Sequence, residues 1–452
     1  MATQNTYINY EQLDKIFTLA KNVFFIGIGG ISQSSLARFC VRSGKRVFGY
    51  DSARSEQSAE LESSCFIKYC STPDSVYGMD LVIYTTAIKE SNLEFAQAKR
   101  LGIPLVSRAN FLGYIMMKYN NRIGICGMHG KSTTTAMLGH IFSYASLSPT
   151  IFCGARMRNF DSAHCFGNSE FVIVEACEYM NAFLSLSPTE VGITCIDLDH
   201  PDFFKSEDEI ICSFQKFIAC AKKIYVNIDN PLSKRLKHEN KISYGIYNRA
   251  DYSAKIVHRG DKNCFLVSYK GDFLCKCSLE LFGEHFVYDA LLAFAIAHQN
   301  GINPSTIKGA LECFKGTKRR MELLGKLDTG VPVFEDYAHH PSEISASING
   351  LLQMGFKSVL CIYQPHTFSR SYYLYDQFKS CFLGVEKLIL MPTFSARESN
   401  TFGINEEQMA LDFGGELIKK VDKIIDFIKN SKFDVIFLMG AGDFSALKDC
   451  LF

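Results

Sequence analysis

The chain has 452 residues, of which 47% are hydrophobic, and its 48 Lys and Arg nearly balance its 47 Asp and Glu. This length predicts about three domains, because one hydrophobic core rarely grows beyond a couple of hundred residues. The net charge of +1 argues against nucleic acid as a partner, and the apolar content argues against a disordered chain.

The sequence also argues against membrane insertion and secretion. No apolar stretch approaches the roughly 20 residues that span a bilayer. Residues 1–10 are polar and lack the pattern of a secretory signal, so we expect a cytoplasmic protein. The 17 cysteines lie scattered in apolar segments without a CxxC pair, which indicates reduced thiols rather than disulfides or zinc ligands.

Strand-like apolar runs alternate with amphipathic helical stretches along the chain. Such runs occupy residues 23–26, 46–50, 81–84, 123–126, 171–174, 358–363, 387–391 and 434–439. The alternation predicts an α/β protein with parallel sheets. Residues 251–281 instead alternate short strand-like segments with turn signals, which indicates antiparallel strands. We expect three domains, at residues 1–118, 119–318 and 319–452.

The first glycine cluster, residues 27–30, joins a strand-like run to a helical stretch. Glycines at such a turn allow backbone amides to approach a phosphate or diphosphate closely. Asp51, one strand later, could bond a ribose or another hydroxyl-bearing group. Because Ser32 stands where the GxGxxG pattern has its third glycine, a tight turn with a capping Asp51 is an equally good interpretation of this segment alone.

The second glycine cluster, Gly127-Met128-His129-Gly130-Lys131-Ser132-Thr133, follows an apolar run and opens a helical stretch. In such a loop Lys131 would neutralise the β- and γ-phosphates and Ser132 would bind Mg²⁺. The spacing departs from GxxxxGK[ST], because Ile125 stands five residues before Gly130. The pattern still favours ATP binding over a glycine-rich turn with an exposed lysine.

Two acidic segments, residues 175–179 and 197–202, come after strand-like runs. Carboxylates and an imidazole beyond strand ends can hold Mg²⁺ against substrate phosphates. Each segment alone could be a solvated loop. Their place after a phosphate loop favours metal ligands, with Glu175 and His200 as the first candidates.

Ten motifs in order along nearly the whole chain resemble those of the Mur ligase family, particularly of its alanine-adding members. The motifs are Gly27-Ile28-Gly29-Gly30, Thr85-Thr86-Ala87-Ile88, Ser107-Arg108, 127–134, 175–179, 197–202, Lys318-Arg319-Arg320, 336–341, Gln364-Pro365-His366-Thr367 and Gly440-Ala441-Gly442-Asp443. The resemblance implies Rossmann-like N- and C-terminal domains that flank a central P-loop-type ATPase domain.

The resemblance also implies a reaction. ATP would phosphorylate the carboxylate of UDP-N-acetylmuramate, and the amine of L-alanine would displace phosphate from the acyl phosphate, as in peptidoglycan precursor synthesis. ATP and Mg²⁺ would be the cofactors, and the protein would be a monomer or homodimer. Catalysis would consist mainly of positioning and charge neutralisation.

The site residues that the resemblance implies fall into five groups. Catalytic roles go to Lys131, Glu175, His200 and Arg320, and the metal ligands would be Ser132, Glu175 and His200. ATP binding goes to Gly127, His129, Gly130, Lys131, Ser132, Thr133, His285, Asp289, Arg320 and Asp336. The UDP-sugar would contact Gly27, Gly29, Gly30, Asp51, Thr85, Thr86 and Arg108. The amino acid would contact Tyr337, His339 and Arg370, whereas His340 and His366 are equally compatible with a structural role.

Several positions depart from the family pattern. Met128 replaces a threonine, Cys195, Phe286 and Asp289 replace asparagines, and Ser32 and Ser35 replace glycines. An ionised Asp289 only accepts hydrogen bonds, so we expect weaker recognition of adenine. The departures leave two alternatives open. One is a Mur-like protein that binds nucleotide or UDP-sugar with little or no ligation, and the other is a ligase that adds another amino acid or a muropeptide.

Overall fold

The N-terminal domain is built on a parallel sheet. The computed structural model describes residues 9–199, 203–259, 262–396 and 398–452. The sheet has five strands in the order β3-β2-β1-β4-β5. These are β1 (Asn22–Ile26), β2 (Arg46–Tyr50), β3 (Phe66–Lys68), β4 (Leu81–Tyr84) and β5 (Leu105–Ser107). The helices are α1 (Tyr10–Leu19), α2 (Ile31–Arg42), α3 (Glu56–Leu61), η1 (Pro73–Val76), α4 (Leu93–Arg100) and α5 (Arg108–Met116).

The middle domain has a ten-stranded sheet in the order β15-β14-β13-β12-β11-β10-β6-β9-β7-β8. Its strands are β6 (Asn121–Cys126), β7 (Thr150–Met157), β8 (Ser162–Cys165), β9 (Phe171–Glu175), β10 (Glu190–Ile193), β11 (Lys223–Asn227), β12 (Lys241–Gly245), β13 (Tyr252–His258), β14 (Asn263–Tyr269) and β15 (Asp272–Leu279). The pairs β13–β14 and β14–β15 are antiparallel, which confirms the prediction for residues 251–281. Its helices are α6 (Lys131–Tyr144), η2 (Tyr179–Ser185), α7 (Glu207–Ile218), α8 (Pro231–Lys234), α9 (Glu284–Gln299) and α10 (Pro304–Glu312).

The C-terminal domain has a six-stranded sheet in the order β16-β17-β21-β18-β19-β20. The edge pair β16–β17 is antiparallel, and the other pairs are parallel. Its strands are β16 (Glu322–Lys326), β17 (Pro332–Asp336), β18 (Val359–Tyr363), β19 (Lys387–Leu390), β20 (Glu416–Leu417) and β21 (Val435–Met439). Its helices are α11 (Pro341–Gln353), α12 (Phe368–Tyr373), α13 (Tyr375–Cys381), α14 (Glu406–Asp412), α15 (Val421–Lys429) and α16 (Ser445–Leu451).

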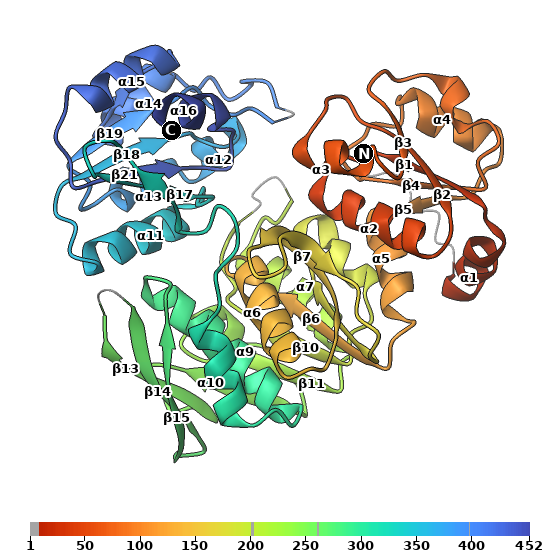
Figure 1. Cartoon of the computed structure of the whole chain (residues 1–452), viewed down its shortest axis with the longest axis horizontal. Coiled ribbons are helices and arrows are strands. Elements are labelled where there is room, and N and C mark those ends of the chain that lie inside the picture. The colour runs from red at the N-terminus through yellow and green to blue at the C-terminus, as the bar shows by residue number, and fades with distance from the viewer. Residues whose placement is uncertain (1–8, 200–202, 260–261, 397) are drawn as a thin grey trace.

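The three sheets confirm the predicted α/β class with parallel strands. In Figure 1 the N-terminal domain (red to orange) and the C-terminal domain (blue) lie on the same side of the middle domain. One apolar core joins α1, α2 and α5 to the middle domain, and another joins α9 to α11 of the C-terminal domain. The predicted limits at residues 118 and 318 fall between the sheets.

Two further expectations from composition can be compared with the structure. All 17 cysteines are free thiols, as predicted. Among the described residues, none of the helices combines the length and the apolar character that crossing a bilayer requires.

Gly113 provides a test of how the N-terminal domain packs on the middle domain. A Cβ at this position of α5 would overlap the Ser185 carbonyl oxygen and the Tyr10 hydroxyl. Overpacking of this kind costs about 1–3 kcal/mol, so Gly113→Ala should lower the Tm by several degrees in a thermal melt. Gly309→Ala in α10 is the matched control, because the atoms nearest to its Cβ would belong to the exposed Tyr144 side chain. The control should keep or raise the Tm, and equal Tm values for both variants would contradict the packing described here.

Candidate active site

Three cavities contain most of the predicted site residues. The first, about 210 Å³, lies between the second glycine cluster, α9 and α11. The second, about 770 Å³, lies in the N-terminal domain around the first glycine cluster. The third, about 730 Å³, is lined by residues of all three domains, with Glu56, Glu175 and Tyr337 among them.

The second glycine cluster forms the loop between β6 and α6. Gly127 and Gly130 have φ values of 136° and 77°, which favour glycine. A Cβ on Gly127 would overlap Thr194, and one on Gly130 would overlap Asp289, so both positions also require the absence of a side chain. The free N–H groups at the start of α6 therefore lie directly after a tight glycine turn, which is the arrangement that binds phosphates.

Lys131, the first residue of α6, folds back over this loop. Its Nζ donates to the carbonyl oxygens of Gly127 (2.6 Å) and Met128 (2.9 Å) and lies 3.0 Å from Glu178 Oε2. Burial disfavours the charged amine, but the neighbouring groups Glu178, Cys177 and Glu175 together outweigh that effect and raise the pKa of Lys131. Glu178 belongs to the acidic segment 175–179 but was not among the predicted site residues. Their spacing in the sequence does not mark Glu178 as the counterion of Lys131, because only the fold brings the two side chains together.

The predicted metal ligands are brought together in part. Ser132 and Glu175 both line the third cavity, and Glu175 Oε2 accepts a hydrogen bond from the Gly154 N–H (2.6 Å). A hydroxyl and a carboxylate beside a phosphate-binding loop fit a hard cation such as Mg²⁺. His200, the third predicted ligand, lies outside the described residues.

The first cavity gathers the predicted ATP-binding residues from distant parts of the chain. It is lined by His129, Gly130, Thr133, His285, Asp289, Arg320 and Asp336. Lys131 and Ser132 line the third cavity instead, and Gly127 lines neither. Burial lowers the pKa of His285 to about 4, so this imidazole is neutral at physiological pH. Burial raises the pKa of Asp336 to about 6.

Asp289 differs from the expectation of a fully ionised carboxylate. The side chain is buried, its Oδ1 accepts a hydrogen bond from Thr134 Oγ1 (3.1 Å), and burial raises its pKa to about 7. Near neutral pH a large fraction of the molecules therefore carries a proton on Asp289. In that form the side chain can donate a hydrogen bond, as the asparagine of the family pattern can.

Other departures from the family pattern have local explanations. Met128 is buried in the core, and its N–H donates to the Cys195 carbonyl oxygen (2.9 Å), so the loop is held through its backbone. Phe286 is buried and supplies an apolar wall to the first cavity. Ser32 Oγ accepts a hydrogen bond from Arg108 Nη1 (3.0 Å), and the serine thereby orients a predicted binding residue.

The second cavity contains the predicted UDP-sugar residues except Thr86. It is lined by Gly27, Gly29, Gly30, Asp51, Thr85 and Arg108. Asp51 Oδ2 accepts the Gly29 N–H (2.8 Å), and Oδ1 accepts the Ser52 N–H (2.8 Å). Asp51 therefore holds the turn while it also lines the cavity. It does not cap a helix, because Gly30 is the N-cap of α2 and has no side-chain bond, and Ser55 is the N-cap of α3.

The predicted amino-acid residues do not share one cavity. Tyr337 and His339 line the third cavity, and the Arg320 guanidinium lies 5.3 Å from the centre of the Tyr337 ring. Arg370 lines none of the three cavities. Its Nη2 lies 3.1 Å from Asp199 Oδ1 and its Nη1 lies 2.8 Å from His366 Nδ1. Since Asp199 belongs to the middle domain and lines the third cavity, this buried ion pair joins two domains at the edge of the site.

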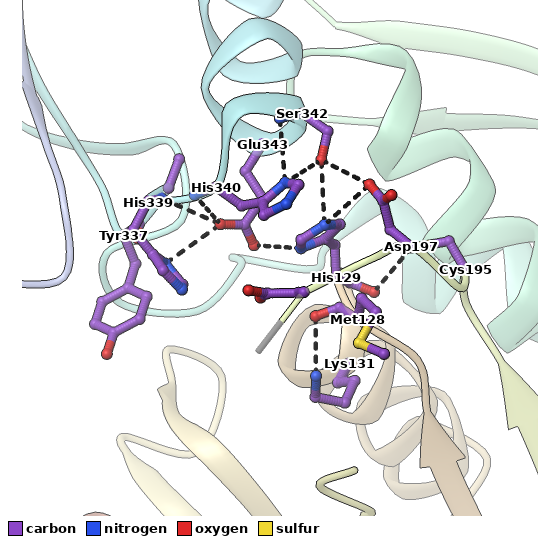
Figure 2. A network of polar contacts seen from close by, with 12 residues as sticks. Met128, His129, Lys131, Cys195, Asp197, Tyr337, His339, His340, Ser342 and Glu343 are labelled. Atoms are coloured by element: carbon purple, nitrogen blue, oxygen red, sulfur yellow. Dashed lines mark hydrogen bonds and ion pairs between the residues drawn. The ribbon is translucent and has the colours of Figure 1, made fainter. Parts of the chain in front are cut away.

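A polar cluster joins the second glycine cluster to α11, as Figure 2 shows. Ligand atoms of His129, Asp197 and His340 all lie within 4.8 Å of one another, a grouping that could hold a metal ion. The Ser342 hydroxyl lies at its centre, 3.2 Å from His129 Nε2, 3.3 Å from Asp197 Oδ2 and 2.8 Å from His340 Nδ1. Hydrogen bonding to this hydroxyl accounts for the cluster without an ion. His340 also caps α11, which supports its structural interpretation.

Comparisons with known proteins identify the family of the chain. Profiles of the Mur ligase family match residues 22–120 (catalytic domain), 125–297 (middle domain) and 319–442 (glutamate ligase domain). A UDP-N-acetylmuramate--L-alanine ligase of Caldicellulosiruptor saccharolyticus is 37% identical over 93% of this chain and 96% of its own length. The chain belongs to the Mur ligase family. A second UDP-N-acetylmuramate--L-alanine ligase, from Clostridium kluyveri, is 38% identical over 94% of this chain and 97% of its own length.

Solved structures show the same fold. UDP-N-acetylmuramate-alanine ligase MurC from Thermotoga maritima matches with a TM-score of 0.83 at 23% identity, over 95% of this chain and 97% of that chain. A murein peptide ligase from Psychrobacter arcticus matches with a TM-score of 0.71 at 21% identity, over 95% of this chain and 98% of that chain. These likenesses confirm the three-domain Mur ligase architecture.

The raised pKa of Asp289 predicts a pH-dependent stability. The folded chain holds this proton up to about pH 7, whereas an unfolded aspartate loses it near pH ~3.9. The stability that protonated Asp289 contributes is therefore lost as the pH rises between those values. Asp289→Asn keeps the acceptor for Thr134 without the charge, so its Tm should rise relative to the wild type as melts are repeated from pH 5 to pH 8.

Asp434→Asn gives the opposite control. Hydrogen bonds from the Lys357 and Ser358 N–H groups lower the pKa of Asp434, so its contribution is present at neutral pH and is lost as the pH falls. The deficit of Asp434→Asn relative to the wild type should therefore shrink at low pH. A difference between Asp289→Asn and the wild type that stayed constant across the pH range would contradict the buried, protonated state of Asp289.

Proposed function

We propose that the protein joins L-alanine to UDP-N-acetylmuramate and converts ATP to ADP and phosphate, as a step in peptidoglycan precursor synthesis. The observation that carries the proposal is the third cavity. Lys131 and Glu175 of the middle domain face the same space as Arg320 and His339. The relatives named UDP-N-acetylmuramate--L-alanine ligase cover nearly the whole chain.

The first step would activate a carboxylate. One carboxylate oxygen of the UDP-sugar attacks the γ-phosphorus of ATP, the bond to ADP breaks, and an acyl phosphate forms. Lys131 and Arg320 would neutralise the charge on the transferred group, because both cations line or border the cavity beside the phosphate-binding loop. Mg²⁺ held by Ser132 and Glu175 would add further neutralisation of the phosphate oxygens.

The second step would form the amide. The neutral amine nitrogen of L-alanine attacks the acyl carbon, the bond to phosphate breaks, and the departing phosphate takes the proton that the nitrogen loses. Burial lowers the pKa of His339 to about 3. Such an imidazole is a weak base, so His339 would orient the amine through a hydrogen bond rather than remove its proton.

The arrangement of the three cavities fits this two-step reaction. ATP would occupy the first cavity and reach the third across Arg320, which lines both. The UDP group would occupy the second cavity, and Ile31 lines both this cavity and the third. A reaction that consumes ATP and a nucleotide-sugar fits an enzyme of the cytoplasm. The enzyme would be a monomer or a homodimer.

Phosphate release from ATP tests the proposal directly. Purified protein with Mg²⁺ and UDP-N-acetylmuramate should release phosphate when L-alanine is added, and less with glycine, L-serine or an alanyl peptide. Lys131→Ala should slow release by about 100-fold or more, because it removes a cation that acts on the transferred group. Lys118→Ala is the matched control, since it removes an exposed ion pair with Asp14 and a cation–π contact with Tyr114, and Lys118 lines none of the three cavities.

The other outcomes would assign a different activity to the protein. If phosphate release is faster with the peptide or with another amino acid, that compound takes the place of L-alanine as the proposed substrate. Binding of the UDP-sugar without any release would support the nucleotide-sugar binding alternative and contradict ligation.

Arg370 provides a separate test of the amino-acid site. We expect its guanidinium to exchange Asp199 for the α-carboxylate of L-alanine, since a bidentate pair suits either carboxylate. Arg370→Lys should then raise the KM for L-alanine about tenfold or more, with little change in the KM for ATP. Asp199→Asn removes the same ion pair but keeps the guanidinium. Equal KM values for L-alanine in the two variants would show that Arg370 serves only to join the domains.

A further inference from the structure

Building on the proposed ligase function, we propose that Glu343 is a positioning residue that couples nucleotide binding to the amino-acid side of the reaction centre. Glu343 lies in the first turn of α11 and lines both the first and the third cavity. Its side chain is only 9% exposed. Figure 2 shows it between His129 and His339.

One oxygen of Glu343 faces the nucleotide side. Oε1 lies 2.9 Å from His129 Nδ1 and 3.6 Å from Arg320 Nη1. His129 belongs to the phosphate-binding loop of the middle domain, and Arg320 lines the first cavity. A ligand that moves this loop or draws Arg320 toward a phosphate therefore changes the surroundings of Glu343 Oε1 directly.

The other oxygen faces the amino-acid side. Oε2 accepts the N–H of His339 (3.1 Å) and the N–H of His340 (3.3 Å), and it lies 3.3 Å from His339 Nδ1. These contacts fix the backbone that carries Tyr337 and His339 into the third cavity. One carboxylate thus joins groups of two domains and two cavities through separate oxygens.

Helix capping alone does not account for this arrangement. A glutamate at this position of a capping box needs one oxygen for the backbone N–H, and glutamine serves equally well there. The second oxygen instead pairs with His129 across the domain boundary and with Arg320 of its own domain. Glu343→Gln keeps the volume and the cap and removes the charge, so this variant separates the two roles.

The test measures how much the binding of one ligand changes the affinity of the protein for the other. In the wild type, a saturating non-hydrolysable ATP analogue should lower the Kd for L-alanine, and saturating L-alanine should lower the Kd for the analogue by the same factor, within the roughly 5–150-fold typical of coupled sites. In Glu343→Gln this factor should fall toward one while the Tm changes by only a few degrees. Glu406→Gln is the matched control, because Glu406 is a first-turn glutamate of α14 that accepts the Thr393 N–H away from all three cavities.

A second measurement does not depend on ligation. With a non-hydrolysable ATP analogue bound, Glu343→Gln should have a larger radius of gyration by small-angle X-ray scattering than the wild type, since one of the contacts that join the middle and C-terminal domains is weakened. Glu406→Gln should match the wild type. An unchanged radius together with an unchanged coupling factor would overturn the proposal and leave Glu343 as a helix cap. Absence of phosphate release by the wild type would contradict the ligase function, and the scattering experiment would still decide the role of Glu343.

Discussion

The ion pair between His129 and Glu343 is the contact on which the composite site depends. It fixes the phosphate-binding loop of the middle domain against the first turn of α11. Because α11 follows β17 directly, the same contact holds Asp336 at the first cavity and Tyr337 at the third. Without it the apolar core between α9 and α11 and the Arg370–Asp199 pair would still join the two domains, but the loop would be held to the first turn of α11 through Ser342 instead of through a charged pair.

Features that are local in sequence could be predicted. The glycine turns at residues 27–30 and 127–130 lie between a strand and a helix because tight turns need backbone conformations that glycine permits. The antiparallel strands of residues 252–279 followed from their turn signals. Recognition of the family then added the residues that line the cavities, since ten motifs in one order carry more information than any single loop.

Contacts between segments far apart in the sequence could not be predicted. Lys131 pairs with Glu178, Arg370 with Asp199, and His129 with Glu343, and the last two pairs cross a domain boundary. Residue type alone also gave the wrong protonation state where burial shifts a pKa. Asp289 was expected to be ionised, but only the structure shows its enclosure, which raises its pKa to about 7.

The same pairs explain how the site tolerates its charge before substrates bind. A cation buried without a counterion would cost several kcal/mol, so each cation meant for a phosphate or a carboxylate first needs a carboxylate of the protein. Glu178, Asp199 and Glu343 occupy these positions for Lys131, Arg370 and Arg320. In the proposed mechanism substrate binding would then exchange one anion for another, which would keep the cations oriented and limit the free energy of desolvation. In the proposed mechanism the acidic residues around the reaction centre would therefore divide into two kinds: Glu175 would bind the metal, and Glu178, Asp199 and Glu343 would hold the cations in place until the substrates arrive.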